Sequence, residues 1–502
     1  MTDNFKQLQR WLENARAAQL SSALAAIAIA LAFLVASVVL APDDARESLA
    51  AGVGPGISTP GGQGGAPSAD GATGGATSTA PGGATDGETS TGETSTGGDG
   101  GADTASVKRV ASDRGVTEDT ILLGALIPDK TLASLGFGTN IRGDFERYIQ
   151  ALADYLNRRG GVSGRTVEVT IRDVDPTSVS DQDAACQSML NDRKVFGIAD
   201  QALASQPAQA CIAEHGETPL VHMAMWSTEY ARRARGYDVS FNPATDRIAR
   251  AVVRDLPAIG WIARGDVVGI FGDNCPHNLS PIRDVLVPGL KAAGATVEVG
   301  LHDCTIEGAI QQPPNIATRF RTAGVTKVVN TANAASLTIF LEAANSLGGW
   351  NPDYAMTDWF GAVSDSMAAN FNANQFDGAI ALTVVREPLI NAGRPPHQGS
   401  DACNAAAVEA GLAELGAPDT DFHYAFCDQF LLLTDTIAAT GPNPTRAVWA
   451  ATVQQMGPRQ STRWGPSSFG PGKTDGADQM YTAFWRRDCR CYMADSGFRA
   501  LG

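Results

Sequence analysis

The stretch from Thr120 to Pro176 constrains the fold most, because it combines a strand, a helix, a glycine-rich turn and a second strand. Its apolar run Ile121–Ile127 is short and nearly continuous, which is typical of a strand buried on both faces. Apolar residues then recur at helical spacing up to Gly160 and Gly161, where the helix is expected to end. After the turn, hydrophobicity alternates as in a strand over Val167–Ile171. This order predicts two parallel strands joined by a crossover helix.

The same alternation of strand and helix patterns continues through the rest of the chain. Further strands are expected at Lys194–Ala199, Pro219–Met223, Val267–Phe271, Thr296–Leu301, Lys327–Thr331 and Tyr354–Thr357. Alternation of this kind implies right-handed crossovers and parallel sheets covered by helices on both faces, which is the α/β class. The part after residue 106 is too long for one ordinary core and long enough for two lobes.

The first 106 residues have a different composition. Residues 17–41 carry no charge, and an apolar helix of this length spans a hydrocarbon core of about 30 Å. Basic residues precede this segment and acidic residues follow it, which predicts a transmembrane anchor with a cytoplasmic tail over residues 1–16. A cleaved signal peptide is the alternative, although a cut after the apolar segment would leave Pro42 at the new N-terminus. Residues 42–106 are rich in Gly, Ser, Thr and Pro and predict a disordered linker.

Composition and motifs exclude several classes of function. The net charge of −16 argues against nucleic acid as a partner. Eight cysteines in a chain that is expected to be exported favour disulfides. The sequence contains no Gly-x-Ser-x-Gly elbow and no His-Glu-x-x-His pair, so we expect no enzyme, no cofactor and no metal site. His222 lies in an apolar strand and is interpreted as a packed core residue.

The glycine-rich turn resembles that of a known protein family. In this family the helix ends in Asn-x-x-Gly-Gly-Val-x-Gly-Arg, and an Asp-Pro pair follows the next strand. The matching residues here are Asn157, Gly160, Gly161, Val162, Gly164, Arg165, Asp175 and Pro176. In these features the chain resembles the type I periplasmic binding proteins, particularly the branched-chain amino-acid-binding (Leu/Ile/Val-binding-like) group of ABC-transporter substrate-binding proteins.

The resemblance implies two lobes, each a parallel sheet with helices on both faces, joined by three hinge crossovers. Lobe 1 would hold residues 107–243 and 385–462, and lobe 2 residues 244–384 and 463–502. The implied function is that of a membrane-tethered, extracytoplasmic solute-binding protein. It would capture a small polar or amino-acid-like ligand between the lobes and deliver it to an ABC permease. An extracellular sensor of the same fold is the alternative, and an exported enzyme is a third reading.

The family architecture also implies that each disulfide stays within one lobe, so that no bridge blocks the hinge. The implied pairs are Cys186–Cys211, Cys275–Cys304, Cys403–Cys427 and Cys489–Cys491. The last pair would close a very small and strained ring. Its cysteines could instead exchange partners with Cys275 and Cys304. Zinc binding by this Cys-x-Cys lacks a second ligand pair at suitable spacing.

Ligand residues are expected in loops at the carboxyl ends of the strands, where helix N-termini also converge. The first such loop of lobe 1 contains Gln201, Ala202 and Ser205. Ser205 matches a family serine that holds a ligand carboxylate, and a helix-capping role is its alternative. In the next loop, family members use a small residue and a Thr or Ser. The corresponding residues are Ala224, Ser227 and Thr228, with Trp226 as a wall.

In lobe 2 the candidate loops follow the strands that begin at Val267 and Tyr354. The first contains Asp273, His277 and Asn278, but it lacks the tyrosine with which the family closes on its ligand. The second contains Asp358 and Trp359, and Asp358 matches a family acid that takes an ammonium group. A solvated loop acid is the alternative for Asp358, and a core position is the alternative for each tryptophan. The missing tyrosine and the added tryptophans make a larger or aromatic ligand as suitable as an aliphatic amino acid.

Overall fold

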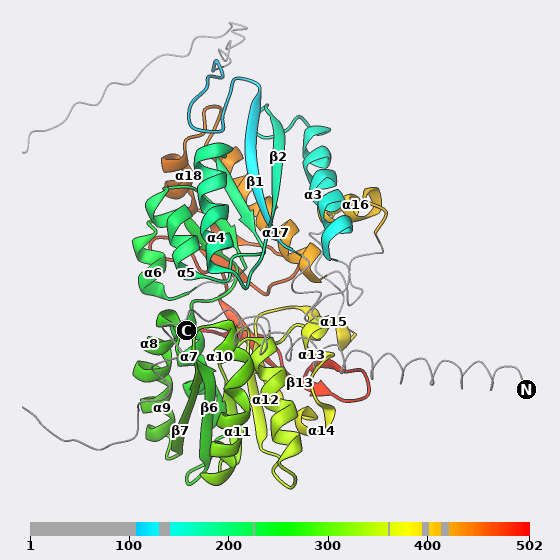
Figure 1. The fold of residues 1–502 in the computed structure, drawn as a ribbon. Helices are drawn as coiled ribbons and strands as arrows, with labels where there is room; N and C mark the ends of the chain where they lie inside the picture. Colours follow the sequence, from blue (N-terminus) through cyan, green and yellow to red (C-terminus); the bar gives the residue numbers. More distant parts are fainter. Residues whose placement is uncertain (1–106, 130–140, 224–225, 360–361, 394–400, 413–420) are drawn as a thin grey trace, which may run out of the picture. The chain divides into compact units, whose positions relative to one another are not determined.

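A computed structural model describes residues 107–129, 141–223, 226–359, 362–393, 401–412 and 421–502 (Figure 1). By its contacts the chain divides into residues 1–100 and residues 101–502, and every described residue belongs to the second unit. The tail, the apolar segment and the linker expected from the sequence lie outside the described residues. Among the described helices, none is both long enough and apolar enough to cross a membrane.

The first sheet has the strand order β2-β1-β3-β4-β5, and all of its neighbouring strands are parallel. Its strands are β1 (Thr120–Pro128), β2 (Thr166–Val174), β3 (Gly197–Asp200), β4 (Leu220–His222) and β5 (Asp238–Ser240). The sequence predicts the first four of these strands. It does not predict β5, because three residues with an aspartate among them carry too little hydrophobic pattern.

The glycine-rich turn that carries the family resemblance is held by its own side chains. Helix α3 ends at Asn157, whose side-chain amide accepts from the N–H of Val167 at 2.7 Å and donates to its carbonyl oxygen at 3.0 Å. Gly161 has a φ of +70°, and a Cβ there would lie 1.8 Å from the carbonyl oxygen of Arg165, so only glycine fits. The buried guanidinium of Arg165 donates to the carbonyl oxygens of Val110, Thr117 and Pro442.

The second sheet repeats this topology and extends it. Its five parallel strands have the order β7-β6-β8-β9-β10, which corresponds strand by strand to the order in the first sheet. Strand β13 continues the sheet antiparallel to β10, and β14 and β15 pair with β13. The strands are β6 (Val267–Asp273), β7 (Thr296–His302), β8 (Lys327–Asn330), β9 (Asp353–Thr357), β10 (Ile380–Thr383), β13 (Gln479–Arg486), β14 (Cys491–Ala494) and β15 (Arg499–Ala500). Strands β11 (Gly457–Arg459) and β12 (Ser467–Phe469) form a separate pair.

Helices connect the strands and pack against them. Those between strands of the first sheet, with the π-helical turns η2 and η3, are α3 (Ile141–Asn157), α4 (Val179–Gln187), η2 (Ser188–Asp192), α5 (Gln206–Ala210), η3 (Cys211–His215) and α6 (Thr228–Arg233). The second sheet has α8 (Pro276–Ser280), η4 (Pro281–Leu286), α9 (Val287–Ala292), α10 (Ile306–Gln311), α11 (Pro313–Thr322), α12 (Ala334–Ser346), α13 (Asp365–Ala368) and α14 (Ala373–Phe376). The remaining helices are α7 (Thr245–Ala258), α15 (Glu387–Asn391), α16 (Asp401–Glu409), α17 (Asp421–Ala439) and α18 (Arg446–Val453).

The chain passes between the two sheets three times. Helix α7 follows β5 and packs against η4, and α15 follows β10 and packs against β14. Helices α16 and α17 then return to the first sheet, where α16 packs on α3 and α17 on β3 and β4. The three passages meet at Trp464, which forms a bridge with Val385 and whose indole N–H donates to Asn242 Oδ1 at 2.7 Å. The residue bounds of the two lobes stay a prediction.

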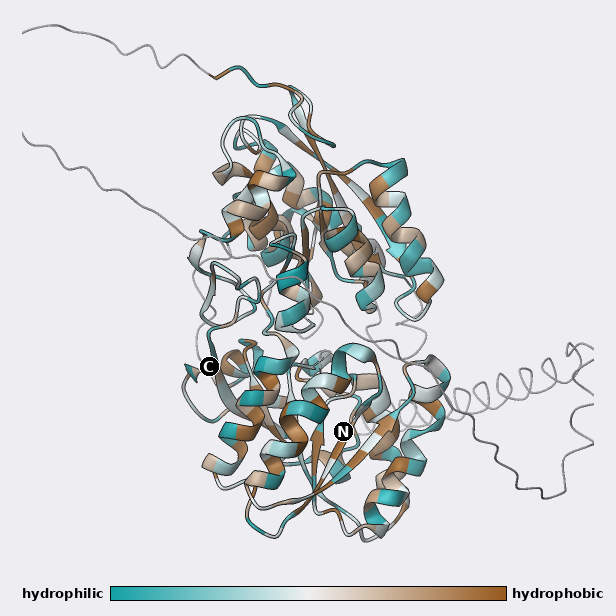
Figure 2. Cartoon of the chain, turned by 90° about the vertical axis from the view of Figure 1, so that its left-hand side faces the viewer, coloured by the Kyte–Doolittle hydropathy of each residue, from teal (hydrophilic) through white to brown (hydrophobic). Residues whose placement is uncertain are grey.

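Buried apolar side chains of both sheets form a continuous core, and Figure 2 shows hydrophobic residues concentrated on the strands and inner helix surfaces. His222 is fully buried, as expected, and its Nε2 lies 2.7 Å from Asp238 Oδ1. The hydroxyl of Tyr230 donates to the other carboxylate oxygen of Asp238 at 3.1 Å. All four expected disulfides are present, namely Cys186–Cys211, Cys275–Cys304, Cys403–Cys427 and Cys489–Cys491.

Candidate functional site

The strand order places polar residues at corresponding positions of both sheets. In each sheet the connections run in opposite directions from the first strand, so the switch points lie between β1 and β3 and between β6 and β8. Strands β3, β6 and β8 end in Asp200, Asp273 and Asn330, and all three side chains are buried. Ligands of open α/β sheets bind at such carboxyl ends.

The loop after β3 is braced by the aspartate at the strand end. Asp200 Oδ1 accepts from the N–H groups of Ala202 and Leu203 at 2.8 and 2.9 Å. Burial raises the pKa of Asp200 to about 6, although these hydrogen bonds and nearby His222 favour the charged form. Gln201 is buried, and its amide donates to the side chain of Gln429 on α17.

Ser205, the predicted carboxylate-binding serine, caps helix α5. Its hydroxyl accepts from the N–H of Ala208 at 3.3 Å. The capping alternative is therefore observed. A single hydroxyl can accept this bond and still donate its proton to a ligand oxygen, so the ligand role of Ser205 stays a prediction.

The loop after β4 is tied to its neighbours by three of the predicted residues, while Ala224 lies outside the described residues. Trp226 is fully buried, and its indole N–H donates to Gln209 of α5. Ser227 caps α6. Thr228 donates from its N–H and its hydroxyl to the carboxylate of Asp246 on α7, both at 2.9 Å. This loop is therefore coupled to the first passage between the sheets.

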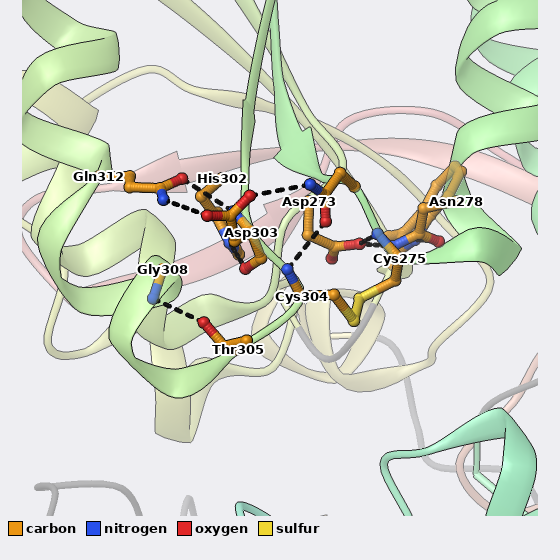
Figure 3. Close-up of a disulfide and its surroundings, with 11 residues drawn as sticks. Asp273, Cys275, Asn278, His302, Asp303, Cys304, Thr305, Gly308 and Gln312 are labelled. Atoms are coloured by element: carbon orange, nitrogen blue, oxygen red, sulfur yellow. Dashed lines mark hydrogen bonds between the residues drawn. A yellow bond between two sulfur atoms is a disulfide. The ribbon is translucent and has the colours of Figure 1, made fainter. Parts of the chain in front are cut away.

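In the second sheet a disulfide joins the loops that follow β6 and β7, between Cys275 and Cys304 (Figure 3). The carboxylate of Asp273 accepts from the N–H of Cys275 at 3.0 Å and from the amide of Asn278 at 2.7 Å. Burial raises the pKa of Asp273. Potential metal-binding atoms of Asp273, Cys275 and His277 lie within 4.8 Å of one another, but the disulfide removes the thiolate that a metal would require.

The loop after β9 is hydrogen-bonded both to the loop after β6 and to the end of β10. The indole N–H of Trp359 donates to Asn278 Oδ1 at 2.8 Å, so the loops after β6 and β9 are joined. Asp358 accepts from the hydroxyl of Thr383 at 2.5 Å and from the N–H of Val384 at 2.6 Å. Burial raises the pKa of Asp358 to about 6. Asp358 is buried rather than solvated, and its hydrogen bonds run to the end of β10.

Two of the predicted residues meet across the two sheets. The ring centroids of Trp226, after β4, and His277, after β6, lie 4.1 Å apart. Burial lowers the pKa of His277 to about 3, which keeps this imidazole neutral at physiological pH. The structure thus brings Trp226, His277, Asn278 and Trp359 into one continuous series of contacts.

Arg463 is a further residue of this region that the sequence reasoning missed. It follows α18 on the third passage, and its guanidinium lies 3.5 Å from the sulfur of Met223, just after β4. Its charge also acts on Asp358, where it favours the ionised carboxylate. The only available signal was its position at the expected 462/463 lobe boundary. No strand end or family motif marks it in the sequence.

The sequence profile of the family described as periplasmic binding protein matches residues 124–489. The chain belongs to the periplasmic binding protein family. The family expected from the sequence is therefore confirmed, together with its two-lobed α/β fold.

Solved structures show the same fold at low sequence identity. A solute binding protein of an ABC transporter from Rhodopseudomonas palustris BisB5, in complex with 3,4-dihydroxy benzoic acid, is 16% identical with a TM-score of 0.58; the match covers 76% of this periplasmic binding protein and 98% of that chain. A branched chain amino acid ABC transporter protein from Thermus thermophilus with bound valine is 14% identical with a TM-score of 0.58. That match covers 76% of this chain and 97% of the Thermus chain. A fatty acid ABC transporter substrate-binding protein from Thermomonospora curvata is 16% identical with a TM-score of 0.57. That match covers 78% of this chain and 93% of the Thermomonospora chain. A search of curated protein sequences gives no match.

Proposed function

We propose that this periplasmic binding protein captures a small solute between its two lobes outside the cytoplasm and delivers it to an ABC permease. The observation that carries the proposal is the contact between Trp226 and His277, which joins the carboxyl ends of two sheets whose parallel strands have the corresponding order. A solute held between these ends would contact both lobes at once. Such a solute would stabilise the closed arrangement relative to an open one.

The charges of this region favour a carboxylic acid as the ligand. The three buried aspartates of this region each already accept two hydrogen bonds from their own lobe, namely Asp200, Asp273 and Asp358. Fewer of their carboxylate lone pairs therefore remain to accept hydrogen bonds from an ammonium group. Arg463 supplies a guanidinium beside Met223, and guanidinium groups bind carboxylates in paired hydrogen bonds. Trp226 and Trp359 would supply aromatic contacts. The dihydroxybenzoate and fatty acid named for two of the structural relatives are both carboxylic acids.

The proposed location is the outer face of the cell membrane. Residues 17–41 would anchor the chain with its N-terminus in the cytoplasm, and residues 42–106 would act as a flexible tether. Crosslinking of the full-length protein in its native membrane should recover a permease subunit. Recovery of a signalling protein instead would favour the sensor alternative.

A thermal-shift screen of the full-length protein tests the ligand proposal. The panel contains hydroxybenzoates, fatty acids, aliphatic amino acids and sugars. A ligand at 100 times its Kd stabilises the folded state by about 2.7 kcal/mol, which gives a clear rise in Tm. The proposal fails if no compound raises the Tm, or if sugars alone do so.

Two variants test the placement of the site. Ser205→Ala should abolish most of the ligand-induced shift and lower the intrinsic stability by about 1 kcal/mol through loss of a helix cap. Thr445→Ala is the matched control, because Thr445 caps α18 through the N–H of Val448 at 3.2 Å in the same way. This control should lose the cap and keep the ligand shift. Equal ligand shifts in both variants would refute the role of Ser205.

A further inference from the structure

One disulfide differs from the others in the spacing of its cysteines. Cys489 and Cys491 are 2 residues apart, whereas the other three pairs are separated by 24 to 29 residues. A disulfide stabilises a fold mainly by restricting the unfolded chain, and this effect is smallest for the shortest loop. This bond therefore contributes little to the stability of the fold.

The hairpin that carries this pair is held by other interactions. Strands β13 and β14 pair over four positions that end at Arg486 and Cys491. The N–H of Tyr492 donates to Asp365 at 2.8 Å, and its hydroxyl to the carbonyl oxygen of Ala362 at 3.0 Å. The guanidinium groups of the turn donate to carbonyl oxygens of the α13–α14 region, from Arg487 to Ala373 and from Arg490 to Ala369 and Phe371. The hairpin can therefore persist when the disulfide opens.

The pair is also accessible to another thiol. Cys489 is exposed and Cys491 is half-buried, whereas each of the other three disulfides contains at least one buried cysteine. The guanidinium groups of Arg487 and Arg490 are engaged by carbonyl oxygens of the α13–α14 region, so accessibility rather than nearby charge distinguishes this pair.

We propose that Cys489–Cys491 is a site of thiol–disulfide exchange with an exposed dithiol of another exported protein. A thiolate of the partner attacks Cys489 Sγ, because Cys489 is the exposed residue of the pair. The bond between the two sulfurs breaks, and Cys491 leaves as a thiolate and takes up a proton. The second thiol of the partner then attacks the mixed disulfide and releases Cys489. The partner is oxidised to a disulfide, and this chain gains two electrons and two protons.

A redox titration of the full-length protein tests whether this pair is labile. The protein is equilibrated in glutathione buffers and quenched with acid, and free thiols are labelled before and after reduction with two isotopic forms of N-ethylmaleimide. Peptide mass spectrometry then reports the reduced fraction of each disulfide. The Cys489–Cys491 pair should open at a [GSH]²/[GSSG] ratio at least about tenfold below that of the other pairs, which corresponds to about 30 mV. The other three disulfides are internal controls, and opening of any of them first or together with this pair overturns the proposal.

Variants test the direction of attack and the exchange itself. Cys491→Ser leaves the exposed thiol of Cys489, which should react with an aromatic disulfide reagent at least about tenfold faster than Cys491 does in Cys489→Ser. The wild-type protein should also oxidise a fluorescent dithiol peptide, and the double variant Cys489→Ser/Cys491→Ser should not. The double variant should keep the wild-type Tm, which shows that it folds. Equal reaction rates of the two single variants, or peptide oxidation by the double variant, would overturn the proposal.

Discussion

Asp358 offers a direct test of how this protein buries charge at the end of a strand. Burial raises the pKa of its carboxyl group from 3.8 to about 6. A shift of about two pKa units corresponds to about 3 kcal/mol of differential stabilisation between the protonated and the ionised form. In Asp358→Asn, the amide oxygen can still accept from the N–H of Val384, and the amide N–H can donate to the hydroxyl oxygen of Thr383. The variant should therefore be more stable than the wild type above pH 7, by up to about 3 kcal/mol.

The sign of the pH dependence follows from the direction of this shift. Because the folded-state pKa of Asp358 is raised, the folded protein binds this proton more tightly than the unfolded chain does. The resulting stability is fully present below about pH 4 and is lost as the pH rises through about 6. The advantage of Asp358→Asn over the wild type should therefore be near zero at pH 4 and maximal by pH 8.

Urea unfolding of both proteins at several pH values between 4 and 8 measures this difference. The comparison of the two proteins isolates Asp358, because Asp200 is buried with a similarly raised pKa in both. Asp183→Asn is the matched control, since it removes one carboxylate at an exposed position of α4. The control should show no advantage that grows with pH. A variant Asp358→Asn that is less stable than the wild type at pH 8 would refute the reasoning.

Three further variants test other features of the fold by urea unfolding. Asp238→Ala removes the buried hydrogen-bond partner of His222 and Tyr230 and should lower the free energy of unfolding by about 3 kcal/mol. A loss under about 1 kcal/mol would show that these two buried groups do not need this partner. In Arg165→Lys, the ammonium group cannot reach all three carbonyl oxygens that the guanidinium binds, so the free energy of unfolding should fall by about 3 kcal/mol. Unchanged stability would show that these hydrogen bonds are dispensable. The double variant Cys275→Ser/Cys304→Ser opens a loop with a sequence separation of 29 and should lose about 3.5 kcal/mol; an unchanged midpoint would show that this bridge does not restrict the unfolded chain.

The loops of the candidate site were predictable because the end of an apolar run in the sequence marks the end of a buried strand. Asp273 is the last residue of β6 and Asp358 follows β9, and both lie where an apolar run that is clear in the sequence stops. Their partners were not predictable in the same way. Asn278 and Trp359 are 81 residues apart, and no local pattern relates an amide in one loop to an indole in another. Strands β5, β10, β11, β12 and β15 were missed; each has four residues or fewer, and such short segments are recognisable as strands only beside their neighbours.

The sequence alone determined the α/β class, most of the strand positions and the family, because hydrophobic periodicity and glycine positions are local properties of the chain. Its turn at Gly160 and Gly161 shows this, since the backbone conformation there requires glycine. The tertiary structure decided which side chains meet, since such contacts depend on how distant segments are brought together. The ring contact of Trp226 with His277 and the position of Arg463 beside Met223 both arise only when the chain has passed between the sheets.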